Sequence, residues 1–177
     1  MDERLKAGLY LAQWHLDQGA MHEAYRLFTE AARSGHPVAL NMLGRVFERG
    51  WGTARDVTRA RELFEAASEG GDGWAFYNLG DLYLVGEGVP INRVCACQAY
   101  IEAARRGVGQ AFNMLGLLHE EGFGDVLPSV THARTYFEAG SDCGDVSARA
   151  NLARLGEAIR SSDRPEATTG REIGTRP

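Results

Sequence analysis

A period of 36 residues runs through the chain and restricts its fold more than any other feature. The pair Leu79-Gly80 is preceded by Leu43-Gly44 and followed by Leu115-Gly116 at that spacing. Further residues that keep the period are Gly50, Gly86 and Gly122; Gly52, Gly88 and Gly124; and Ala24, Ala60 and Ala96. A repeat of about 20–50 residues indicates a solenoid of stacked supersecondary units.

Each unit predicts two helices joined by a turn. In the central unit, Phe76, Leu79 and Tyr83 fall at i, i+3 and i+7, which is one stripe of an amphipathic helix. Gly86 stands where a helix ends in a left-handed residue, and Asn92 is a good N-cap for a second helix. The equivalent residues of the flanking units are Gly50 and Gly122 at the helix end, and Asp56 and Ser129 at the helix start.

Glycine recurs in the middle of the first helix of three units, at Gly44, Gly80 and Gly116. A mid-helix glycine costs about 1 kcal/mol relative to alanine. Its recurrence therefore needs a packing reason, and we expect two helices to approach each other closely at these residues.

The pattern resembles Sel-1-like repeats, which are relatives of tetratricopeptide repeats. The matching residues in the central unit are Ala75, Leu79, Gly80, Tyr83, Gly86, Gly88, Val89, Ala96, Tyr100, Ala103, Ala104 and Gly107. The resemblance covers residues 5–158 and is weaker in the fourth unit, which departs from it at His119, Gly140 and Ser141. It implies an all-α fold, an α-solenoid with a right-handed superhelix, that serves as an interaction scaffold; it does not imply a reaction.

The period also predicts the organisation of the chain. The first unit has a shortened turn at Gln18-Gly19-Ala20, and the fourth has one extra residue between Gly124 and Ser129. The last range is rich in Ser, Thr, Pro, Gly and charge, a composition that does not support a packed core. The predicted ranges are 1–35 for an atypical N-terminal repeat, 36–72, 73–108 and 109–146 for three repeats, 147–159 for a capping helix and 160–177 for a disordered tail.

The composition of the chain limits the classes of partner that it is expected to bind. The net charge of −5 argues against a nucleic-acid binder, because phosphate binding depends on an excess of Lys and Arg. No run reaches the roughly 20 apolar residues needed to cross a bilayer, and the N-terminus does not resemble a signal peptide. We expect a cytoplasmic protein, with a monomer favoured and with another protein or peptide segment as its partner.

No catalytic, cofactor or metal site is predicted. Cys95 and Cys97 point to different sides of a helix, and with Cys143 they supply too few ligands for zinc without further partners. The five histidines form no constellation, and His15 and His119 take the place of the repeat's Tyr. The chain is therefore expected not to be an enzyme.

The remaining candidate site is a concave groove. In the tetratricopeptide relatives, the first helices of successive units line the concave surface, and the resemblance implies the same here. The implied groove residues are Asn41, Arg45, Glu48, Trp74, Tyr77, Asp81, Leu84, Gln110, Asn113, Leu117 and Glu120. Trp74 fits equally a groove anchor and a local packing staple, whereas Tyr77 favours the groove.

The sequence thus favours a noncatalytic adaptor that binds a protein segment in this groove. The resemblance suggests bacterial regulatory, secretion-accessory or immunity proteins. Two alternatives stay open. One is a hydrolase, because cysteine-rich relatives interact with β-lactams. The other is a repeat protein that assembles with itself through exposed end helices.

Overall fold

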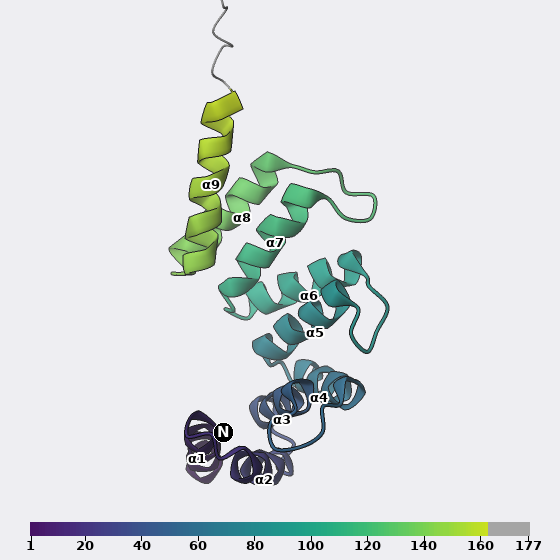
Figure 1. The fold of residues 1–177 in the computed structure, drawn as a ribbon, viewed down its shortest axis with the longest axis vertical. Coiled ribbons are helices and arrows are strands. Elements are labelled where there is room, and N and C mark those ends of the chain that lie inside the picture. Colours follow the sequence, from purple (N-terminus) through teal and green to yellow (C-terminus); the bar gives the residue numbers. More distant parts are fainter. Residues whose placement is uncertain (163–177) are drawn as a thin grey trace, which may run out of the picture.

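The computed structural model describes residues 1–162, which form nine α-helices stacked along one long axis (Figure 1). The helices are α1 (Glu3–Asp17), α2 (Met21–Ala32), α3 (Pro37–Arg49), α4 (Val57–Glu69), α5 (Gly73–Val85), α6 (Arg93–Arg105), α7 (Gln110–Glu121), α8 (Val130–Asp142) and α9 (Val146–Ser162). In that range the only β-type pairing is an isolated bridge between Phe123 and Val126. The predicted all-α solenoid is confirmed.

Consecutive helices pack as antiparallel pairs, each of which also packs against the next. The pairs are α1 with α2, α3 with α4, α5 with α6, and α7 with α8. The single helix α9 packs against α7 and α8 and ends the stack. It reaches Ser162 and therefore includes the first residues of the range expected to be disordered, while 163–177 lie outside the described residues.

The predicted N-caps of the second helices are confirmed. The side chain of Asp56 accepts a hydrogen bond from the Arg59 amide at 3.0 Å, and that of Asn92 from the Cys95 amide at 3.0 Å. Ser129 caps α8 in the same way. Each cap satisfies an amide that the helix itself leaves without a partner.

The predicted left-handed helix ends are confirmed in two units and wrong in one. Gly50 and Gly86 are left-handed, with φ of 70° and 81° and ψ near 30°. Gly122 has a φ of 78° but a ψ of 157°, so the chain leaves α7 in another direction. The extra residue of this turn is accommodated by paired backbone hydrogen bonds between Phe123 and Val126.

Three mid-helix glycines each lie under an aromatic ring, which supplies the expected packing reason. A Cβ added to Gly80 would lie 2.6 Å from the Tyr100 ring. Gly44 meets Phe64, and Gly116 meets Phe137, at similar distances. In these three repeats the first helix therefore approaches its second helix so closely that no side chain fits at the contact.

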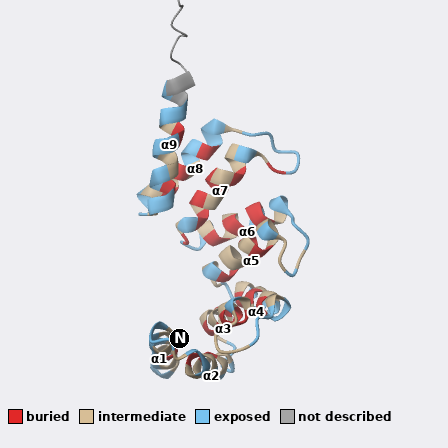
Figure 2. Ribbon diagram, in the orientation of Figure 1, coloured by how far each residue is buried: buried red, intermediate tan, exposed pale blue. Residues whose placement is uncertain are grey.

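The core follows the stack as a line of apolar clusters between helices (Figure 2). Phe28, Phe64, Tyr100 and Phe137, one from each second helix, are fully buried. At the C-terminal end, Leu155 of α9 completes the last cluster by packing with Phe137. The capping helix thus covers apolar surface of the last repeat.

Candidate functional site

Two of the predicted groove residues are buried between repeats. The Asn78 side chain of α5 donates a hydrogen bond to Asn41 of α3 at 2.8 Å, and Asn151 of α9 donates to Asn113 of α7 at 2.9 Å. Asn41 and Asn113 are both buried. The next first helix covers their oxygens, so neither side chain is available to a bound segment, contrary to what the sequence implied.

Apolar residues occupy the same two positions in the alternate interfaces. Leu9 and Met42 take the places of Asn41 and Asn78 between the first and second repeats, and both pack against one core cluster. Between the third and fourth repeats the places are taken by Tyr77 and Met114, which pack against the next cluster. Apolar and amide pairs therefore alternate along the stack.

The third repeat carries an exposed aromatic group. The Trp74 ring meets the Tyr77 ring edge-on, with centroids 5.6 Å apart, and Tyr77 meets the buried Tyr100 at 5.5 Å. Trp74 stays 47% exposed, so the ring lies against the protein on one side and faces solvent on the other. Trp74 therefore packs locally against Tyr77 and also presents one side of its ring to solvent, so the two roles that the sequence left as alternatives are compatible.

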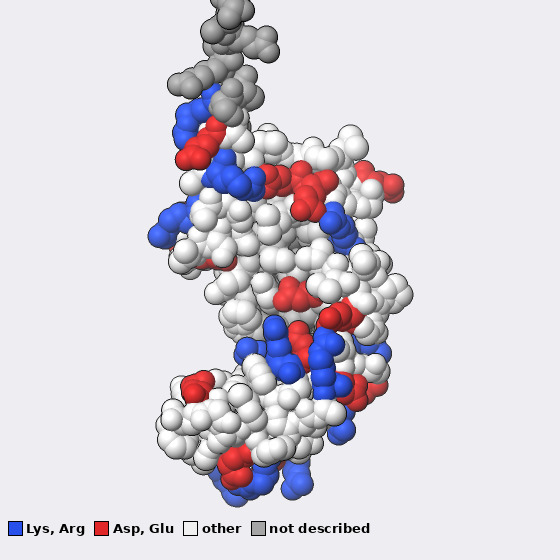
Figure 3. All heavy atoms as spheres, viewed as in Figure 1, with Lys and Arg blue, Asp and Glu red and all other residues white. Residues whose placement is uncertain are grey.

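Asp81 lies beside this group and is partly buried. Its carboxylate accepts a hydrogen bond from the Tyr100 hydroxyl at 2.7 Å. Burial raises the pKa of Asp81, and the nearby Glu48 carboxylate raises it further, whereas the Tyr100 bond and Arg49 lower it. Burial and the Asp81 charge also raise the pKa of Tyr77 to about 12. Acidic and basic side chains gather where α3 and α4 meet α5 (Figure 3).

Arg45 and Glu120 make contacts away from Trp74 and Tyr77, whereas Leu84 packs against the same core cluster as Tyr77. Arg45 lies over the Trp51 ring, 5.5 Å from its centroid. Glu120 receives two hydrogen bonds from Arg154 of α9, at 2.8 and 2.6 Å. Gln110 is exposed, whereas Leu84 and Leu117 are half-buried and pack against core clusters. The structure therefore brings together Trp74, Tyr77 and Tyr100, with Asp81 bonded to Tyr100, while Glu48 and Arg49 of α3 form an ion pair whose charges act on Asp81.

A serine and a histidine that sequence reasoning did not connect lie together at the start of α8. Ser129 Oγ is 2.7 Å from His132 Nδ1, and the His132 ring is 5.4 Å from that of His119. The same Oγ also accepts the His132 amide as an N-cap. A nucleophile needs a base that is itself oriented by a third group, and no described carboxylate bonds to His132. The pair is accounted for by helix capping.

Within residues 1–162, no three His, Cys, Asp or Glu side chains gather closely enough to hold a metal ion. Cys95, Cys97 and Cys143 are free thiols. In the same range, no helix is both long enough and apolar enough to cross a membrane.

The period, the paired helices and the ring-covered glycines agree with one family model. The Sel1 repeat model matches residues 10–36, 37–72, 75–108 and 110–145. The chain belongs to the Sel1 repeat family. Sel1 repeat proteins bind other proteins, and their fold is a typical noncatalytic scaffold. A comparison with curated proteins finds no match.

Several solved structures superpose on most of this chain. A Sel1 repeat protein from Oxalobacter formigenes is 28% identical with a TM-score of 0.79, over 88% of this chain and 65% of that protein. The protective antigen c5321 of uropathogenic Escherichia coli is 21% identical with a TM-score of 0.78, over 88% of this chain and 34% of its own length. The immunity protein Pa5087 from Pseudomonas aeruginosa is 20% identical with a TM-score of 0.66, over 91% and 61%. The similarities to c5321 and Pa5087, at 21% and 20% identity, establish the fold alone. This chain spans less than two thirds of the length of each of the three proteins.

Proposed function

We propose that this Sel1 repeat protein is a noncatalytic adaptor that binds a segment of another protein at a surface centred on Trp74 and Tyr77. Asp81 lies beside Tyr77 and Tyr100, and we call the surface formed by Trp74, Tyr77 and Asp81 the aromatic surface. The observation that carries the proposal is the half-exposed Trp74, held edge-on by Tyr77 in a repeat whose Tyr100 already fills the core. Large aromatic side chains that the core does not need are typical binding hot spots.

The chemistry of the aromatic surface favours a particular kind of segment. The exposed side of the Trp74 ring is apolar, and Asp81 beside it already has the Tyr100 hydroxyl as its hydrogen-bond partner. We infer a segment that carries an apolar or aromatic residue, which packs on Trp74.

Affinity capture with mass spectrometry tests the proposal. The wild-type chain is compared with a Trp74→Ala, Tyr77→Ala variant. A control is Leu127→Ala, Val146→Ala, which removes two exposed apolar side chains from other parts of the chain. The captured protein is then titrated directly against all three chains. We expect the first variant to weaken binding by at least about tenfold and the control to leave it unchanged. Equal binding by wild type and the Trp74 variant rejects this surface.

The hydrolase alternative predicts a different result. If Ser129 acted as a nucleophile, a β-lactam would be turned over or would add its mass to the chain, and Ser129→Ala would abolish both. No adduct and no turnover are expected.

A further inference from the structure

The N-terminal face of the stack exposes apolar side chains at positions that every other repeat buries. Trp14 is 56% exposed and Tyr10 is 77% exposed, whereas Leu82, at the position of Trp14 in the third repeat, is 2% exposed. Leu11 is also exposed. The buried equivalents of Leu11 and Trp14 are Leu43, Leu79 and Leu115, and Val46, Leu82 and Leu118. In those repeats, the preceding helix pair provides the cover.

A groove lies beside this face because the first repeat has a glycine where the later repeats have a large side chain. Gly8 stands where the later repeats have Leu40, Phe76 and Phe112, so no side chain fills the space between α1 and α2. A groove of about 350 Å³ results, with Leu5, Gly8, Leu27 and Ala31 among its lining residues. A Cβ built on Gly8 would have no atom within 4 Å. The groove is therefore open to a large side chain from outside.

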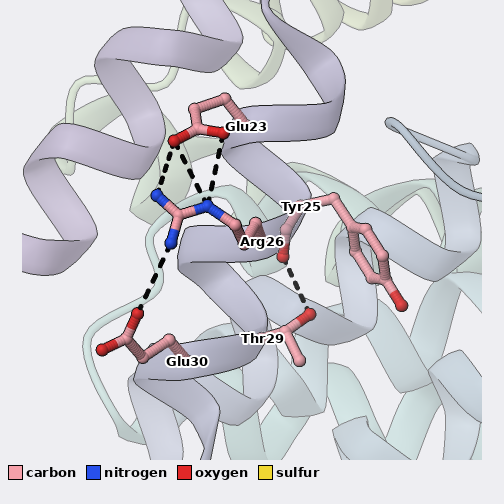
Figure 4. Close-up of polar contacts among 5 residues, drawn as sticks. All are labelled: Glu23, Tyr25, Arg26, Thr29 and Glu30. Carbon is pink, nitrogen blue, oxygen red and sulfur yellow. Dashed lines mark hydrogen bonds and ion pairs between the residues drawn. The ribbon is translucent and has the colours of Figure 1, made fainter.

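Polar and charged side chains lie on α2 and at the opposite end of the stack, whereas the N-terminal face is apolar. On α2, Arg26 is bound by Glu23 and lies 3.9 Å from Glu30, and the Thr29 hydroxyl donates to the Tyr25 carbonyl (Figure 4). At the other end, the α9 positions that would face a following repeat are exposed and small or polar, namely Ser147, Ala150, Arg154 and Glu157. A head-to-tail contact would set the apolar α1 face against these side chains, which is unfavourable.

The α1 face is complementary to itself in antiparallel orientation. A two-fold axis between Tyr10 and Leu11 places Trp14 of one copy at the level of Ala7 and Gly8 of the other, so that a large side chain meets small ones and the open groove. It also brings Asp17 to the level of Arg4. Neither Arg4 nor Asp17 forms an ion pair within residues 1–162. Size and charge thus match under one symmetry operation, as an isologous interface requires.

We propose that a second copy of this chain covers the N-terminal face, with α1 packed antiparallel on α1 in a two-fold dimer. The aromatic surface on α5 stays open in this arrangement, so the dimer goes beyond the proposed adaptor role and does not depend on it. The sequence favoured a monomer because periodicity describes what repeats share, whereas the interface depends on how the first repeat departs from the others.

Sedimentation equilibrium of the 177-residue chain, over a concentration series, tests the dimer. We expect a mass that rises from 19.3 kDa to about 39 kDa and no higher, as a closed two-fold interface requires. Trp14→Glu should raise the dimer dissociation constant at least about 100-fold. Trp74→Glu, which alters a similarly exposed tryptophan elsewhere, should change it less than about threefold. A single 19.3 kDa species at every concentration, growth beyond the dimer, or indifference to Trp14→Glu overturns the proposal.

Two further variants test the antiparallel register. Arg4→Glu and Asp17→Lys should each weaken the dimer about tenfold, since each acts twice across the axis, and the double variant should restore it.

Disulfide cross-linking tests the same register independently. In a chain with Cys95 and Cys143 changed to Ser, Leu11→Cys should cross-link to itself on oxidation. Arg4→Cys should not, because its two copies lie about 20 Å apart along the helices. Self-cross-linking at Arg4→Cys but not at Leu11→Cys overturns the register.

Discussion

At the scale of single residues, the contact between a glycine and an aromatic ring determines how closely the helices of a repeat pair. Gly80→Ala improves helix propensity but sets a methyl group 2.6 Å from the Tyr100 ring. We expect a loss of about 1–3 kcal/mol in the free energy of unfolding, measured by urea denaturation. Gly156→Ala is the control, since the nearest atom to its Cβ is 3.9 Å away. It should gain up to about 1 kcal/mol, and equal effects of the two changes would contradict the account.

His119 makes the stability of the fourth repeat depend on pH. Burial lowers its pKa, the neighbouring His132 lowers it further, and its Nδ1 is buried without a hydrogen-bond partner. The unfolded chain therefore binds more protons than the folded chain, so stability is lost as the pH falls through 6.5, the ordinary histidine value. His119→Phe, which copies Phe47 of the second repeat, should lose less stability between about pH 7.5 and about pH 5.5 in urea melts. An identical loss in both chains would argue against His119 as the cause.

At the scale of helices, the asparagine pair between α3 and α5 is a hydrogen bond inside an otherwise apolar contact. Asn41→Leu leaves the Asn78 amide buried without its partner and should cost about 1–3 kcal/mol in a urea melt. The double variant Asn41→Leu, Asn78→Met copies the residues found one interface earlier, Leu9 and Met42. We expect it to recover most of the loss. Additive effects of the two substitutions would show that the pair is not coupled.

The Asn41–Asn78 pair also shows which features of the structure could not be predicted from the sequence. The 36-residue period, the caps and the glycine positions depend on local chemistry, and they predicted the helices and their pairing. Counting along a helix also placed Asn41 and Tyr77 on one face. It did not show how deeply the next helix covers that face, because this depends on the packing of side chains far apart in the sequence. Asn78 and Asn151 were therefore missed as partners.

At the scale of the whole molecule, the stack is stable only if its last apolar surface is covered. Leu155→Ala removes the α9 side chain that packs on Phe137 and should cost about 2–4 kcal/mol in the free energy of unfolding. Leu127→Ala, in the exposed turn of the same repeat, should change it by less than about 0.5 kcal/mol. Because repeats in a solenoid contact only their neighbours, a cap variant should also melt first at the C-terminal end, which hydrogen exchange resolves by helix. Uniform loss of protection from α1 to α9 would contradict this.

The alternation of apolar and amide pairs has a consequence for how such a chain can gain or lose repeats. Removing residues 36–71 would set Leu9 against Asn78 and leave an amide facing a hydrocarbon side chain. Removing residues 36–107 would set Leu9 against Met114, two side chains of the kind already found at that position. We therefore expect the fold to tolerate the duplication or deletion of two repeats better than that of one.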